Sequence, residues 1–148
     1  MKDSTRTQLE QNLGDQLNAL ISASHSLNVK TAARFDSTLQ PAAFLIVRWL
    51  YSFGPTSATV LAKSTAMDRS SISRLVNQLK RLDYVKSETT PDDRRGILLS
   101  LTKLGREKTI DALKEKEFIF YERISKWNDQ KLEKFIDLLK DFNGHNCK

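Results

Sequence analysis

Residues that build disulfides, metal sites and nucleophilic active sites are scarce in this sequence. It contains one cysteine, Cys147, and two histidines, His25 and His145. A single cysteine cannot close an internal disulfide, and zinc sites usually take three or four cysteine or histidine ligands. We therefore expect no internal disulfide, no bound metal and a reducing environment.

Long apolar segments are also absent. No apolar run approaches the roughly 20 residues that cross a bilayer. The first residues, MKDSTRTQLEQ, lack the apolar stretch of a secretory signal. The sequence therefore predicts a cytoplasmic protein with no membrane partner. Because it also lacks a glycine-rich phosphate loop and a nucleophile motif, we expect neither an enzyme nor a cofactor.

Positive charge, by contrast, is plentiful and unevenly distributed. The formal net charge is +6, and residues 41–102 hold nine lysines or arginines against five acids. A concentrated positive charge attracts polyanions, because binding releases their counterions. The distribution favours a nucleic-acid partner, although an ordinary basic surface is the alternative.

Hydrophobic spacing predicts six helices and two short strands. The segment AAFLIVRWLYSF, which follows Pro41, is apolar on almost every side and should be the most buried helix. Pro41 suits a first helical turn, and Gly54-Pro55 ends that helix. The predicted helices cover residues 8–35, 41–53, 58–65, 69–82, 103–126 and 129–142, and the predicted strands cover 84–89 and 97–102.

This order of elements predicts a mainly α protein with a small two-stranded β wing. Two short helices joined by a tight turn and followed by a hairpin make a winged helix-turn-helix. We expect that lobe over residues 41–102 of a single chain spanning 1–148. The long helices over 1–40 and 103–148 carry more apolar surface than such a lobe can cover, so we expect them to pair in a homodimer.

The second short helix has a composition suited to the major groove of DNA. Asp68 precedes it as a cap, and its apolar stripe runs from Ile72 to Leu79. Arginine can pair with guanine, and asparagine or glutamine with adenine, so the polar side predicts base recognition. The alternative is a solvated helix face. The candidate DNA-binding residues on this side are Arg69, Ser70, Ser71, Ser73, Arg74, Asn77 and Gln78.

The turn between the strands, residues 91–96, is unusually charged. Two adjacent arginines repel each other and suit a structural turn poorly, but one arginine can enter a narrow, electronegative minor groove. We therefore assign Arg94 and Arg95 to DNA contact at the wing, with Asp93 holding one guanidinium in position. A charged, solvent-exposed turn is the alternative. Thr56 or Ser57 caps the first short helix, and both are candidate phosphate contacts.

The stretch from Leu39 to Thr102 resembles the MarR family of regulators. The most specific feature is the wing pattern Pro-x-Asp-Arg-Arg followed by Leu-Thr-x-x-Gly. Asp83 is a departure, because the family often has glycine there and aspartate adopts a left-handed cap less readily. The matching segments are Gly54-Pro55, Leu61-Ala62, Arg69 to Val76, Leu79, Pro91 to Arg95, and Leu101 to Gly105.

The resemblance implies a dimeric transcriptional regulator, here expected to be a repressor, that binds pseudo-palindromic duplex DNA. It also implies frequent release by small phenolic or lipophilic ligands or by thiol oxidation. The family's thiol sensors carry a cysteine near the N-terminus, which Cys147 does not match. Trp49, Phe53 and Met67 are candidates to line a ligand pocket, and core packing is the alternative. The alternative function is a winged-helix module that binds protein or RNA.

Overall fold

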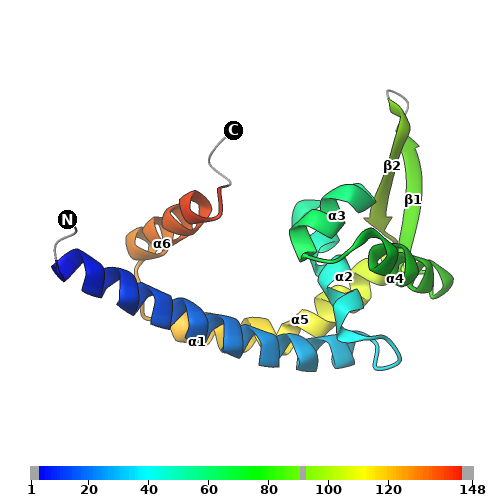
Figure 1. Ribbon diagram of the computed structural model, residues 1–148. Coiled ribbons are helices and arrows are strands. Elements are labelled where there is room, and N and C mark those ends of the chain that lie inside the picture. The colour runs from blue at the N-terminus through cyan, green and yellow to red at the C-terminus, as the bar shows by residue number, and fades with distance from the viewer. Residues whose placement is uncertain (1–3, 91–92, 145–148) are drawn as a thin grey trace. The chain divides into compact units, whose positions relative to one another are not determined.

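The computed structural model describes residues 4–90 and 93–144, with the backbone alone for residues 90 and 93–95. The chain divides into two compact units, residues 1–113 and 114–148. The predicted order and type of the helices and strands are confirmed (Figure 1). The elements are α1 (Ser4–Phe35), α2 (Pro41–Phe53), α3 (Ala58–Thr65), α4 (Arg69–Arg81), β1 (Val85–Thr90), β2 (Asp93–Leu101), α5 (Lys103–Ile124) and α6 (Asp129–Phe142).

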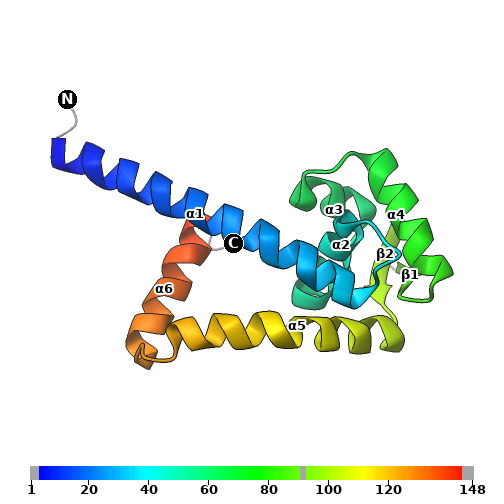
Figure 2. The same ribbon diagram turned by 90° about the horizontal axis from the view of Figure 1, so that it is seen from below.

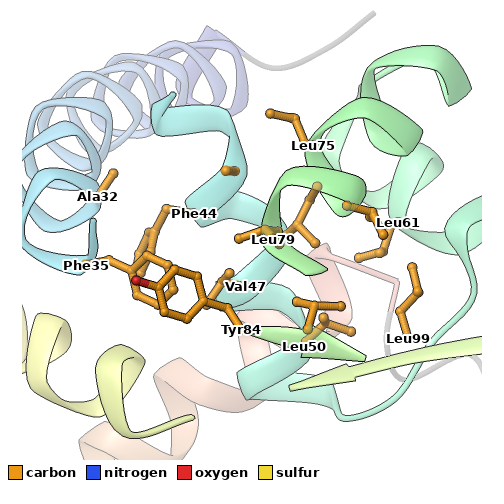
Figure 3. Packing of buried hydrophobic residues seen from close by; sticks show 14 of the residues in the cluster. Ala32, Phe35, Phe44, Val47, Leu50, Leu61, Leu75, Leu79, Tyr84 and Leu99 are labelled. Carbon is orange, nitrogen blue, oxygen red and sulfur yellow. The ribbon is translucent and has the colours of Figure 1, made fainter. Parts of the chain in front are cut away.

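Helix α2 is central to the core of the first unit, as its apolar composition predicts. Its buried residues include Phe44, Val47 and Leu50, and the helix contacts α1, α3, α4 and β2. Gly54, with a φ of 82°, ends α2 and donates its N–H to the carbonyl of Leu50. Figure 3 shows Leu61 of α3 and Leu99 of β2 at one end of this core, with the aromatic rings at the other end.

An aromatic cluster joins the end of α1 to the segment that follows α4. Phe35 is buried, and the centre of its ring lies 5.6 Å from that of Phe44 and 4.8 Å from that of Tyr84 (Figure 3). The Tyr84 hydroxyl donates to Asp36 Oδ2 at 2.7 Å. Asp36 lies in the loop that leads from the end of α1 to α2, and Figure 2 shows the course of this loop.

The Asp36–Tyr84 pair shifts the pKa values of both groups. Partial burial alone would raise the pKa of Asp36, but hydrogen bonds from Thr38 and Tyr84 and the charge of Lys108 hold it below its usual value. Burial and the bond to Asp36 raise the pKa of Tyr84 to about 12. Folding therefore favours the ionised carboxylate and the neutral phenol.

We expect Tyr84→Phe to lower the free energy of unfolding by about 1 kcal/mol at neutral pH, because it removes one charge-assisted hydrogen bond. The contribution of Asp36 is present above its unfolded pKa near 3.8 and is lost as the pH falls through the lower folded value. The contribution of Tyr84 is complete below pH 10 and is lost as the pH rises through about 12. Urea denaturation of both proteins across this range tests the pair. If the difference in free energy of unfolding between the two proteins did not change with pH, the proposed contribution of the Asp36–Tyr84 bond would be wrong.

The Leu-Thr-x-x-Gly motif forms the junction between the sheet and α5. Thr102 donates its N–H to Tyr84 O at 3.0 Å and its hydroxyl to Asp83 O at 2.5 Å, while its Oγ1 accepts the Gly105 N–H at 2.9 Å. Gly105 is buried, and a Cβ there would lie 2.1 Å from Tyr84 O. Asp83 has a φ of 63°, so it adopts the left-handed conformation where the family often has glycine.

The second strand begins earlier than its sequence predicts. Residues 93–96 were expected in the turn, but β2 begins at Asp93, so this part of the prediction is wrong. The strands are antiparallel, and the register shifts after Thr89: Thr89 pairs with Ile97, whereas Thr90 pairs with Asp93. Residues 94–96 therefore lie between two pairs that are adjacent on β1, as in a β-bulge. Charge alone gave no sign that the strand could continue through such a bulge.

The second compact unit consists of the end of α5 and the whole of α6. Asn128 caps α6 by accepting the Lys131 N–H at 2.8 Å. The Trp127 ring meets Phe135 edge to face at 5.5 Å between ring centres, and Lys131 lies 4.6 Å from the Trp127 ring centre. None of the fourteen described residues of α6 is buried, although six of them are leucine, isoleucine or phenylalanine, most of them with the apolar spacing of a packed helix.

Candidate nucleic-acid interface

Two capped helices form the helix-turn-helix. Ser57 Oγ accepts the Val60 N–H at 3.2 Å at the start of α3, and Asp68 accepts the Ser71 N–H at 2.7 Å at the start of α4. The turn between them contains Ala66 in the left-handed region, with a φ of 56°. Hydrogen bonds from the Ser71 backbone and hydroxyl hold the pKa of Asp68 below its usual value. The carboxylate therefore stays ionised as a cap, and its predicted role is confirmed.

Helix α4 has one buried side and one polar side, as predicted. Ile72, Leu75, Val76 and Leu79 are all buried against α2 and α3. This stripe fixes the rotation of the helix, so that the polar side is turned away from the core. Of the candidate DNA-binding residues, Arg69, Ser70, Ser73, Arg74 and Asn77 are exposed, whereas Ser71 and Gln78 are half-buried.

The polar residues of α4 form two rows. Ser73, Asn77 and Lys80 line a groove of about 360 Å³ that α4 shares with α3 and with Gly96 and Ile97 of β2. The second row faces the loop between α1 and α2, where Gln78 and Arg81 line a hollow with residues 38–40. Lys80 was not among the predicted site residues, although its helical spacing from Ser73 and Asn77 places it in the same row.

Both candidate arginines of α4 are bound by residues outside the helix. Arg69 donates to Thr59 Oγ1 of α3 at 2.5 Å, and Arg74 donates to Gln40 Oε1 at 3.4 Å. Each guanidinium has five N–H donors, so these bonds leave most of its donors available. Thr59 and Gln40 were not predicted as site residues, because their partners lie 10 and 34 residues away in the sequence.

The hairpin adjoins α3 and α4 through Thr56 and Leu99. Thr56 exchanges two backbone hydrogen bonds with Leu99, at 3.0 and 2.8 Å, so the segment before α3 pairs with β2. Figure 1 shows the hairpin rising from this attachment beside both helices. Thr56 and Ser57 are half-buried at this contact. The side chains of Asp93, Arg94 and Arg95, predicted at the wing, lie outside the described residues.

A shallow hollow lies on the side of α2 that faces the end of α3. Trp49 and Phe53 line it together, with their ring centres 4.3 Å apart. The hollow measures about 300 Å³, and Arg48 contributes a cation to its lining. Met67 is not part of this lining and packs against the hydrophobic core instead.

Within residues 4–90 and 93–144, no three histidine, cysteine or acidic residues gather as a metal site would need. The helices described there are too short or too polar to cross a bilayer.

The capped α3–α4 pair, its polar outer side and the adjoining hairpin define a winged helix-turn-helix DNA-binding protein. Comparison with known proteins identifies its family. Residues 37–96 match the sequence profile of the MarR family. The HTH-type transcriptional regulator YxaD of Bacillus subtilis is 33% identical over 106 residues, which cover 71% of this chain and 73% of YxaD. The chain therefore belongs to the MarR family, whose members are DNA-binding transcriptional regulators.

Two further comparisons are informative. The HTH-type transcriptional repressor NicR of Pseudomonas putida is 34% identical over 70 residues, which cover 47% of this chain and 44% of NicR. The crystal structure of NadR in complex with 4-hydroxyphenylacetate superposes with a TM-score of 0.69 and 20% identity, over 84% of this chain and 89% of NadR. At that identity the likeness to NadR concerns the fold alone.

Proposed function

We propose that this protein represses transcription by binding a pseudo-palindromic operator in duplex DNA as a homodimer. The observation that carries the proposal is α4, whose buried stripe turns an exposed polar side outward beside a hairpin wing. A helix of this kind fits the major groove, and a dimer places two such helices one helical turn of DNA apart. The similarity to the repressor NicR supports the direction of regulation.

Selection of bound sequences from a random duplex pool tests this function. We expect two related half-sites whose centres are separated by about 10 base pairs or a multiple. Affinity for the selected sequence should fall steeply as the salt concentration rises, because phosphate contacts release counterions. A module that binds protein or RNA would select no duplex sequence, and that outcome would overturn the proposal.

Exposed apolar side chains on the terminal helices support the homodimer. In α1, Leu9 is 61% exposed and Ile21 is 66% exposed, and in the second unit Phe118 and Phe142 are 68% and 65% exposed. Large apolar side chains exposed in this way in a monomer favour association. Since both units carry such residues, a second copy can cover equivalent faces in a two-fold arrangement.

We expect the wild-type protein to sediment as a dimer at micromolar concentration and the Ile136→Glu, Phe142→Glu double variant to sediment as a monomer. Each substitution would place a charge in an apolar interface, which costs several kcal/mol when the charge is unpaired. Leu82→Glu, at an exposed leucine after α4, is the control and should remain dimeric. A monomeric wild-type protein would contradict the proposed assembly.

The hollow beside α2 supports an aromatic acid as the signal that releases DNA. Trp49 and Phe53 offer apolar faces for a ring, and the guanidinium of Arg48 offers a partner for a carboxylate. Arg48 bonds to Ser52 Oγ and lies 5.7 Å from the Tyr51 ring centre, so its head group is held near the hollow. NadR, which shares the fold, was crystallised with an acid of this class.

A second acid for the test is 6-hydroxynicotinate, which regulates DNA binding by BpsR of Bordetella bronchiseptica, a protein of the same fold. We expect 4-hydroxyphenylacetate or 6-hydroxynicotinate to raise the free energy of unfolding by about 2.7 kcal/mol at a hundred times the dissociation constant. Either compound should also weaken binding to the selected operator. Arg48→Gln should abolish both effects, whereas Lys63→Gln, at an exposed lysine of α3 outside the hollow, should preserve them. Thermal unfolding with and without the acids measures the first effect. If no aromatic acid stabilises the wild-type protein, the proposal that such an acid releases DNA is wrong.

A further inference from the structure

The loop between α1 and α2 reaches the recognition helix through one side chain, that of Gln40. Gln40 occupies the N-cap position of α2, but its side chain makes no capping bond. The next residue, Pro41, has no N–H to cap, and the Ala43 N–H bonds to the Gln40 carbonyl at 2.9 Å. The side-chain amide is therefore not needed by α2, and its Oε1 accepts a bond from Arg74 Nη1 at 3.4 Å.

The loop that carries Gln40 is itself held in place. Asp36 Oδ1 accepts both the backbone N–H and the hydroxyl of Thr38, at 2.9 and 2.5 Å. Asp36 Oδ2 accepts the Tyr84 hydroxyl at 2.7 Å, and the Leu39 N–H bonds to the Asp36 carbonyl at 3.2 Å. Gln40 consequently projects from a loop that is anchored both to α1 and to the segment after α4.

The bond from Gln40 suits an arginine that reads a base. Arg74 is exposed in the middle of α4, where an unbound side chain would sample many rotamers and lose that freedom on contact with DNA. A neutral oxygen restricts the guanidinium without cancelling its charge, which a carboxylate would do. One bond also leaves the planar group with enough donors for the two acceptors of guanine.

We propose that Gln40 is a positioning residue that sets base specificity by holding Arg74 for contact with one base pair in each half-site. This inference rests on the proposed function, because it requires α4 to read DNA. It places a determinant of specificity outside the helix-turn-helix, in the loop that follows α1. The loop that follows α1 then sets the direction in which the Arg74 side chain extends toward the base.

The test compares Gln40→Met, which keeps the length of the side chain and removes the acceptor, with Arg74→Ala. Arg74→Ala should reduce discrimination at one base pair of each half-site by at least about tenfold. Gln40→Met should reduce discrimination at the same base pair by roughly threefold to tenfold, as expected for one hydrogen bond. In the Arg74→Ala background, Gln40→Met should have no further effect. Affinity for random duplex and the unfolding midpoint should stay at the wild-type values in Gln40→Met.

Two further variants complete the design. Gln40→Glu keeps an acceptor and should preserve discrimination at that base pair, but it should lower affinity for every duplex, because its carboxylate cancels the charge of Arg74. Gln130→Met, at an exposed glutamine of α6, makes the same chemical change in the other compact unit and should behave as wild type. If Gln40→Met retains full discrimination, or still acts when Arg74 is alanine, the inference is wrong while the regulator function stands. If the wild-type protein selects no sequence at all, both are wrong.

Discussion

Gly105→Ala is expected to lower the free energy of unfolding of the first unit by at least about 3 kcal/mol, the upper range for overpacking. A Cβ at this position would lie 2.1 Å from Tyr84 O and 2.9 Å from Tyr84 C. Both are backbone atoms, and they cannot move aside as the end of a flexible side chain can. The same carbonyl accepts the Thr102 N–H, so any displacement would also disturb the start of α5.

Helix propensity predicts the opposite sign for this substitution, which makes the measurement decisive. Alanine in a helix interior is favoured over glycine by about 0.5–1 kcal/mol when space is available. Gly14 of α1 provides the matched control, because no atom lies within 4 Å of a Cβ built there. Urea denaturation at a fixed protein concentration should show a lower midpoint for Gly105→Ala and no loss for Gly14→Ala. A Gly105→Ala protein as stable as the wild type would refute the close packing.

Most helix boundaries could be predicted from the sequence, because they depend on local chemistry. The exceptions include the start of α1, at Ser4 instead of residue 8, and the end of α5, at Ile124 instead of residue 126. Pro41, Gly54 and Asp68 begin or end helices at the predicted residues, since each acts through its own backbone or through a neighbour within four residues. The buried stripe of α4 was also correct, because four apolar residues at helical spacing can face only one side. These features required no knowledge of the tertiary structure.

The parts that sequence reasoning did not recover depend on contacts between distant segments. The start of β2 at Asp93 requires Thr90 opposite it, and the pattern of charges suggested a turn instead. The contact of Gln40 with Arg74 joins a loop to a helix 34 residues later, and nothing in the local sequence of either indicates it. The role of Gly105 is similar, because the motif was matched by resemblance and its physical cause is the carbonyl of Tyr84.

The second large effect is expected from substitutions in the wing, which should change the affinity for DNA. We expect Arg94→Ala and Arg95→Ala to be unequal, one abolishing operator binding and the other weakening it modestly. Both residues lie on β2, and the sequence predicts that Asp93 bonds one guanidinium so that the other points outward. Only one of the two guanidinium groups should therefore enter the minor groove, where narrow A·T-rich sequence deepens the negative potential. Filter binding to operators with A·T or G·C base pairs at the site edges measures both effects.

Asp93→Ala distinguishes a positioned arginine from a simple electrostatic clamp. Asp93 begins β2 as the partner of Thr90, so its backbone has a defined place beside the two arginines. If its carboxylate holds one guanidinium so that the other points outward, removing it should weaken operator binding despite the loss of a negative charge near DNA. If the wing were only an electrostatic clamp, losing this negative charge would tighten binding. The salt dependence of the affinity would then become steeper by about one phosphate contact. Asp93→Asn is the matched control, because it removes the charge and keeps an acceptor oxygen, and it should fall between alanine and wild type. Tighter binding by Asp93→Ala would mean that the wing contacts phosphates alone.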